Sequence, residues 1–168
     1  MNVRNYSDNC NSCDALCCRV FEVLDTRGIQ IKSIWDAACK YLECDKCNVY
    51  DSRKDKWLDV CIEYSCLWIW PILTNWVRSK KIDESIPNIA NRNKLLAKTF
   101  WLMRDSVMDL LEIDDTRKIN LIPHEVHMWV LNRLDGVLWL IRPQHTIGEI
   151  QEIFDFNLRK SKIQWELF

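Results

Sequence analysis

Two Cys-x-x-Cys pairs constrain the fold of this chain more than any other feature of its sequence. The first pair is Cys10 and Cys13, the second is Cys44 and Cys47, and thirty residues lie between them. Each pair can hold one metal ion from a single tight turn, and a tetrahedral structural zinc ion takes two such pairs. We expect the intervening segment to be a helical hairpin, because two helices of similar length return the second pair to the first. The pattern therefore predicts a structural zinc site with four thiolate ligands.

Other cysteines compete for places in this set. Cys17 lies one helical turn after Cys13, and Cys39 lies shortly before the second pair, so both are rival ligands. Two alternatives to a metal site stay open. Free cysteines are often buried as small apolar residues, and a thiol with a lowered pKa can act in redox chemistry or catalysis.

Cysteine usage also indicates a cellular compartment. The chain has nine cysteines, an odd number, and Met1 is not followed by the charged and apolar segments of a secretory signal. We therefore expect a reducing compartment, cytoplasm or nucleus, in which the thiols are free or bound to metal. The longest apolar run, Cys66 to Val77, has about half the length of a membrane span, so no membrane partner is expected.

Composition favours a folded protein over a disordered one. The 168 residues are 48% hydrophobic and include nine tryptophans but three glycines, whereas disordered chains are poor in aromatic residues. The formal net charge is −1, which gives the whole protein no attraction to nucleic acid or to an anionic membrane.

Apolar residues at helical spacing cover most of the chain before residue 114. Trp57, Trp68 and Trp76 belong to an aromatic stripe that is too wide for a surface helix, so it is expected in the core. Pro71 lacks an amide hydrogen and should divide this stripe between two helices. Trp68 and Phe100 are expected to share one core. The expected helices span residues 12–26, 33 to the second cysteine pair, 52–69, 71–79 and 88–113.

The sequence after Thr116 changes character. Val126 to Leu131 and Val137 to Ile141 are β-favouring runs that flank Asp135-Gly136, a dipeptide typical of hairpin turns. We therefore expect a β-hairpin here. The alternative is one helix from Pro123 to Ile141, which would hold Gly136 in its interior at a cost of about 1 kcal/mol.

A capping box follows this region. Thr146 and Glu149 have the spacing at which two residues cap each other's backbone, which predicts a helix over 147–158. A strand over 162–168 is expected to end the chain. Hairpin, capped helix and strand in this order resemble the first part of a ubiquitin-like β-grasp module. The whole chain is thus expected to be mainly α, with a helical, cysteine-rich unit over 1–115 and a small α+β segment over 116–168 that packs on it, or with both in a single domain.

Few residues carry a catalytic signature. His124 and His127 fall one residue short of the spacing in the zinc-protease motif H-E-x-x-H, and His145 precedes a helix start. The sequence contains no glycine-rich phosphate loop, no G-x-S-x-G elbow and no dinucleotide fingerprint. A non-catalytic function is therefore favoured over an enzyme.

Three classes of function follow. We first expect an intracellular adaptor, or a regulatory or viral accessory protein, that folds around structural zinc and binds another protein. Trp139 and Trp165 are the expected anchors for that partner, because aromatic residues dominate binding energy at interfaces. The second class is a nucleic-acid-binding regulator that uses Arg53-Lys54-Lys56 and Arg78-Ser-Lys80-Lys81, and the third is a thiol-dependent enzyme.

Overall fold

A computed structural model gives the arrangement of most of the chain. The described residues are 15–44, 46–59, 61, 70–114, 123–142 and 144–165. The expectations for Cys10, Cys13 and Trp68, and for half of the helix over 52–69, lie outside these residues. The first part of that segment is described, and residues 51–57 form turns there.

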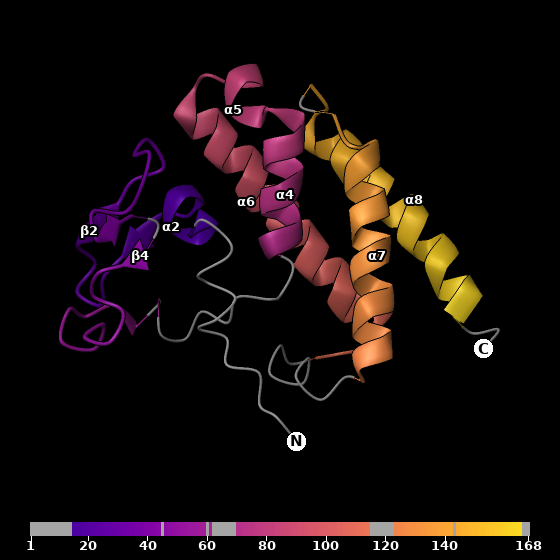
Figure 1. Cartoon of the computed structure of the whole chain (residues 1–168), viewed down its shortest axis with the longest axis horizontal. Coiled ribbons are helices and arrows are strands. Elements are labelled where there is room, and N and C mark those ends of the chain that lie inside the picture. Colours follow the sequence, from indigo (N-terminus) through magenta and orange to yellow (C-terminus); the bar gives the residue numbers. More distant parts are fainter. Residues whose placement is uncertain are drawn as a thin grey trace.

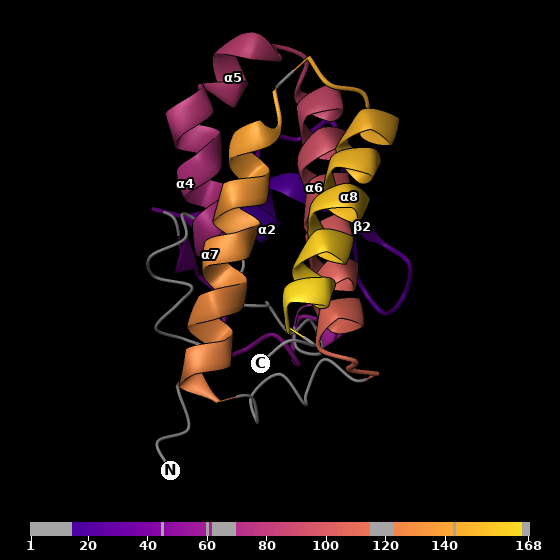
Figure 2. The same ribbon diagram turned by 90° about the vertical axis from the view of Figure 1, so that its right-hand side faces the viewer.

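A bundle of long helices forms the main body (Figure 1). It is built from α4 (Trp70–Lys80), α6 (Ile89–Leu110), α7 (His124–Leu140) and α8 (Ile147–Trp165), and a short α5 (Ile82–Ser85) leads from α4 to α6. Helices α4 and α7 run in one direction, and α6 and α8 run in the other. Figure 2 shows α4 beside α7 and α6 beside α8, the two pairs being joined where α7 packs on α8. The expectation of a mainly α protein is confirmed.

Helices α4 and α6 form where apolar periodicity predicted them. Asn88 caps α6 by accepting a hydrogen bond from the amide of Asn91 at 3.0 Å. The apolar positions of α6 then recur every three or four residues and point into the core. The fully or nearly fully buried ones include Leu96, Phe100, Met103, Val107 and Leu110.

The capping box at the start of α8 is also confirmed. The amide of Thr146 donates to Glu149 Oε2 at 2.6 Å, and the amide of Glu149 donates to Thr146 Oγ1 at 3.3 Å. The helix continues to Trp165, so the strand expected over 162–168 is wrong as far as the described residues extend. No glycine or proline interrupts residues 149–165, and helical hydrogen bonding therefore has nothing to stop it.

The β-hairpin expected over 126–141 is wrong, because residues 126–140 belong to helix α7 and Ile141 caps its end. As a helix, the segment buries Val130, Leu134, Val137, Leu138 and Ile141 against the bundle. Gly136 lies on the exposed side, where the missing side chain costs no packing. Tertiary burial of a wide apolar face therefore outweighs the turn preference of Asp135-Gly136. Because the hairpin is absent, the resemblance to a β-grasp module is wrong as well.

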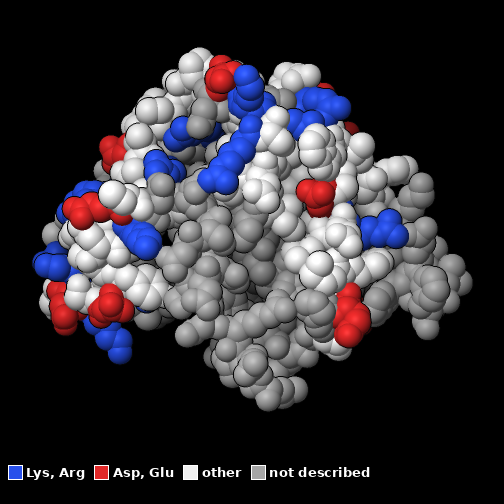
Figure 3. All heavy atoms as spheres, in the orientation of Figure 1, with Lys and Arg blue, Asp and Glu red and all other residues white. Residues whose placement is uncertain are grey.

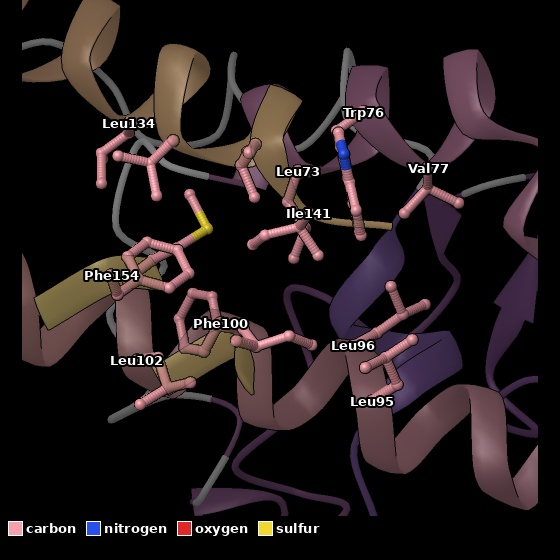
Figure 4. Packing of buried hydrophobic residues seen from close by; sticks show 14 of the residues in the cluster. Leu73, Trp76, Val77, Leu95, Leu96, Phe100, Leu102, Leu134, Ile141 and Phe154 are labelled. Atoms are coloured by element: carbon pink, nitrogen blue, oxygen red, sulfur yellow. The ribbon is translucent and has the colours of Figure 1, made fainter. Parts of the chain in front are cut away.

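Side chains from helices α2, α4, α6, α7 and α8 share the larger core. Figure 4 shows Phe100 of α6 next to Phe154 of α8, with Leu73 and Trp76 of α4 on the other side. Leu16 joins the same core from the N-terminal part. This core draws on both of the units expected from the sequence, and the boundary at residue 115 stays a prediction.

The N-terminal part does not form the expected helical hairpin. It contains a short helix α2 (Leu16–Val20) and two small antiparallel pairs, β1 (Val23–Leu24) with β2 (Gln30–Lys32) and β3 (Leu42–Glu43) with β4 (Lys46–Cys47). A second, smaller core of Val23, Ile31 and Leu58 lies here.

Local side-chain hydrogen bonds explain why the helices over 12–26 and from Ser33 are wrong. The carboxylate of Asp25 accepts from the amides of Arg27 at 2.9 Å and Ile29 at 2.8 Å, which fixes a turn in which Gly28 has a φ of 79°. The amide of Ser33 donates to Asp36 Oδ2 at 2.6 Å, but this cap closes a single turn only. Short polar side chains of this kind compete with helix formation.

Candidate functional site

Four cysteines come from four segments of the N-terminal part, and two of them, Cys39 and Cys61, pack on the smaller core. Cys18 lies in α2, Cys39 in the loop after β2, Cys47 in β4 and Cys61 after the turns at 51–57. We call these four residues the thiol cluster. The amide of Cys39 donates to the carbonyl oxygen of Cys18 at 2.8 Å, which joins two of the segments directly. Cys39 and Cys61 both pack on the core formed by Val23, Ile31 and Leu58.

Arg53 connects the segments that carry Cys47 and Cys61. Its Nη1 donates to the carbonyl oxygen of Cys61 at 2.8 Å, and its Nε donates to that of Tyr50 at 2.7 Å. Tyr50 in turn donates its amide to the carbonyl oxygen of Cys47 at 3.2 Å. The guanidinium also lies 3.8 Å from the centre of the Tyr50 ring. Arg53 is therefore a structural residue of this unit.

The thiols of the cluster influence each other's ionisation. Burial raises the pKa of Cys61 to about 11, and Cys18, Cys39 and Cys47 contribute to this rise. Burial likewise raises the pKa of Cys39 and of Cys47, with further contributions from neighbouring thiols of the cluster. Every pair among the four interacts in this way, because a second thiolate nearby disfavours the charged form of the first.

Cys18 differs from the other three. A hydrogen bond with Cys17, whose Sγ lies 4.0 Å away, lowers the pKa of Cys18 against the opposing effect of burial. The cations Arg19, Lys32 and Arg53 lower it further. Cys18 is thus the member of the cluster that ionises most readily.

The cluster overlaps little with the zinc ligands expected from the sequence. Of the expected four, Cys44 is exposed and Cys47 belongs to the cluster, whereas Cys10 and Cys13 lie outside the described residues. The rival Cys39 is a member, and Cys17 adjoins Cys18. Within the described part of the chain, no three Cys, His, Asp or Glu side chains stand in an arrangement that holds a metal ion.

Sequence reasoning missed Cys18 and Cys61. Neither forms a Cys-x-x-Cys pair with another member, so no spacing rule connects them to the cluster. Cys61 packs on the core of Val23, Ile31 and Leu58, and the backbone of Cys18 accepts a hydrogen bond from Cys39, in a loop–strand arrangement that the incorrectly predicted helices did not contain.

A second candidate site is a groove between the end of α7 and the first half of α8. It has a volume of about 360 Å³ and is lined by Leu140, His145, Glu149, Glu152, Ile153, Phe156 and Asn157. Phe156 is 70% exposed and Leu140 is 50% exposed, although both are large apolar residues. Figure 2 faces this side of the molecule, where α7 and α8 lie next to each other. We call this the α7–α8 groove.

The groove lining is acidic. Glu149 and Glu152 are its charged residues, and segment 147–157 contains no lysine or arginine. Arg142 lies nearby, but its guanidinium donates to the carbonyl oxygen of Trp139 at 2.6 Å. The amide of Arg142 donates to His145 Nδ1 at 3.0 Å, which orients the imidazole at the groove's edge.

The two predicted partner anchors lie toward opposite ends of the bundle, because Trp139 is near the end of α7 and Trp165 is the last residue of the antiparallel α8. Trp139 is 50% exposed, and the ammonium of Lys80 lies 4.2 Å from the centre of its ring. The backbone of Trp165 ends α8, and its side chain lies outside the described residues, as do the side chains of His124 and His127.

Each of the two basic segments contains residues that contact other parts of the chain. Besides Arg53 and Lys80, Lys81 pairs with Glu84 at 3.7 Å. On the face shown in Figure 3, acidic and basic side chains alternate over the N-terminal part. No helix in the described part of the chain combines the length and apolarity of a membrane span.

In comparisons with known proteins, no protein-family model, no curated protein and no solved structure matches the chain.

Proposed function

We propose that the protein is a non-catalytic adaptor that binds a partner protein through the α7–α8 groove. The observation that supports this function most directly is the exposure of Phe156 beside Leu140 in a groove. Burying a large apolar side chain contributes about 1.5–3 kcal/mol, so a monomer gains nothing by leaving Phe156 in water. Exposed apolar residues with a polar rim are typical of binding sites.

The groove lining defines the chemistry of the partner. Glu149 and Glu152 favour a positively charged segment, while Leu140, Ile153 and Phe156 favour an apolar one. A third helix can lie along two neighbouring helices when it presents one apolar face. The proposed partner segment is therefore an amphipathic helix with an apolar face and flanking lysine or arginine.

Free thiols support a reducing compartment as the place of this function. Cys17, Cys18, Cys39, Cys44, Cys47 and Cys61, the described cysteines, form no disulfide. Trp139 lies next to Leu140 in the sequence and stays a proposed anchor at the edge of the groove.

A pair of synthetic helices tests the proposal. One is a short amphipathic peptide of leucine and lysine, and the other carries glutamate in place of lysine. Fluorescence anisotropy should show saturable binding of the basic peptide and weak binding of the acidic one. Phe156→Ser should abolish binding, and Glu152→Lys should reverse the preference for the basic peptide over the acidic one. Met128→Ser is the control, because Met128 is exposed on α7 outside the groove lining, and it should leave binding of both peptides unchanged. Equal binding of both peptides by the protein and by Phe156→Ser would contradict the proposal.

A further inference from the structure

Helix α2 contains two cysteines in adjacent positions, Cys17 and Cys18. Their Sγ atoms lie 4.0 Å apart, a distance at which one thiol can donate a hydrogen bond to the other. Neighbouring side chains of a helix do not normally face each other, so both thiols turn toward the space between them. Both residues are only partly buried. The pair is therefore a dithiol that a small reagent from solvent can reach.

A disulfide between these two residues would be strained. Adjacent Cα atoms are about 3.8 Å apart, whereas disulfides usually join Cα atoms that are about 4.4–6.8 Å apart. The sulfurs would have to approach from 4.0 Å to about 2.05 Å, and the small ring that results includes the peptide bond between the two residues, so the backbone must move as well. Strained disulfides are easily reduced and are typical of regulatory sites. A disulfide here would therefore be reversible.

Helix α2 is weakly secured against such a change in its backbone. It has only five residues, and no side chain caps its first turn. Ala15 at the N-cap position has a φ of 48°, a left-handed conformation in which the Cβ atom crowds the following carbonyl oxygen. Short helices gain little stability from their own hydrogen bonds. Rearrangement of α2 therefore costs less than rearrangement of a long, capped helix.

The two cysteines also carry the contacts of α2 with its surroundings. The amide of Phe21 donates to the carbonyl oxygen of Cys17 at 3.1 Å, and the amide of Cys39 donates to that of Cys18 at 2.8 Å. Helix α2 packs on α6, with Leu16 in the larger core (Figure 1). A change in the backbone of the pair therefore disturbs the contact of α2 with the bundle and its contact with the loop that carries Cys39.

We propose that Cys17 and Cys18 are a redox-sensitive modification site, at which a low-molecular-weight disulfide such as glutathione disulfide produces an internal disulfide that opens α2. The thiolate of one cysteine attacks the small disulfide, which gives a mixed disulfide and releases one small thiol. The other cysteine loses its proton, attacks the protein sulfur of the mixed disulfide and releases the second small thiol. Two protein thiols are oxidised and one small disulfide is reduced to two thiols. Cys18 attacks first, because its hydrogen bond with Cys17 and nearby cations lower its pKa.

A short peptide reports the state of the pair directly. Cleavage before Asp14 by endoproteinase Asp-N and after Arg19 by trypsin releases residues 14–19, which contain Cys17 and Cys18 and no other cysteine. The folded, full-length protein is incubated with glutathione disulfide, and the remaining thiols are alkylated before digestion. We expect this peptide to carry an internal disulfide and no alkyl group, and to be alkylated at both cysteines after treatment with excess reduced glutathione. A peptide that is fully alkylated after oxidation, retains glutathione or is joined to another cysteine would overturn the proposal.

Hydrogen–deuterium exchange tests the effect on α2. After oxidation of the wild-type protein, the amides of Phe21 and Cys39 should lose protection, because the carbonyl oxygens that accept from them belong to the pair. Cys17→Ser should show no such loss, whereas Cys44→Ser, at an exposed cysteine outside α2, should respond as the wild type does. If Cys17→Ser does not fold, the wild type before and after reduction provides the comparison. An internal disulfide without faster exchange in α2, or the same loss of protection in Cys17→Ser, would overturn the proposal.

Discussion

At the scale of single residues, Asn93 joins the helical bundle to the N-terminal part. It is fully buried on α6, and its Nδ2 donates to the carbonyl oxygens of Ile34 at 2.8 Å and Asp36 at 3.4 Å. Arg92 donates to its Oδ1 at 3.2 Å. One side chain thus satisfies backbone groups almost sixty positions away in the chain.

Asn93→Ala should lower the free energy of unfolding by about 1–3 kcal/mol, because it removes the two hydrogen bonds to Ile34 and Asp36, each worth about 0.5–1.5 kcal/mol. Urea denaturation measures this change. Asn91→Ala is the matched control, since Asn91 is an exposed residue of the same helix, and it should stay within about 0.5 kcal/mol of the wild type. Equal losses in the two variants would mean that the hydrogen bonds of Asn93 contribute nothing.

Asp25 makes stability depend on pH. Burial acts to raise the pKa of this carboxyl, but hydrogen bonds from the Arg27 side chain and from the amides of Ile29 and Arg27 outweigh it and hold the pKa below its usual value. A carboxylate with a lowered folded-state pKa stabilises the protein above its unfolded pKa of about 3.9, and the contribution disappears as the pH falls through the folded-state value.

The stability difference between the wild type and Asp25→Asn should therefore be constant from neutral pH to about 5 and shrink toward pH 2. Thermal melts across this range provide the measurement. Asp51→Asn, which removes an exposed carboxylate, should give a small difference. A difference for Asp25→Asn that does not change with pH would show that the lowered pKa is absent.

At the scale of elements, Gly136 in helix α7 and Gly28 in the turn after β1 should respond in opposite ways to replacement by alanine. Gly136 lies in the interior of α7, and a Cβ added there would meet no atom within 4 Å. Gly136→Ala should stabilise the protein by about 0.5–1 kcal/mol, because alanine favours the helix and restricts the unfolded chain. Gly28→Ala should destabilise it, because Gly28 has a φ of 79°. Differential scanning calorimetry gives the melting temperature of both variants. A lower melting temperature for Gly136→Ala would contradict the helix and favour a hairpin turn at this position.

Helices whose capping residues and apolar periodicity lie within one short segment were predictable from the sequence. Asn88 with the apolar period of α6, and Thr146 with Glu149 at the start of α8, encode their helix within a few residues. The incorrect elements are those in which a local signal and tertiary packing disagree. Asp135-Gly136 signals a turn, yet the buried face around Leu134 and Leu138 makes a helix. Ser33 and Asp36 form a cap, but it closes a single turn that does not continue into a helix. The thiol cluster depends on that same packing, so its members could not be paired by spacing.

At the scale of the whole molecule, Phe100 links the parts of the larger core. Its side chain is fully buried, and its ring centre lies 5.5 Å from that of Phe21, which follows α2, and 5.1 Å from that of Trp101. Phe100→Ala should cost about 3–5 kcal/mol in the free energy of unfolding. Phe156→Ala, at an exposed site of the same residue type, should change it little. Urea titrations followed by circular dichroism compare the two, and similar midpoints would place Phe100 outside the stabilising core.

Helix α6 packs against both α2 and α8, and this central position has a kinetic consequence. Its middle amides, around Phe100 and Met103, can meet solvent only when the surrounding elements separate. Deuterium from heavy water should therefore reach them last, at a rate set by global unfolding, and reach the short β3–β4 pair early. The order in which the amides exchange would map how the chain comes apart, from its cysteine-bearing end toward α6.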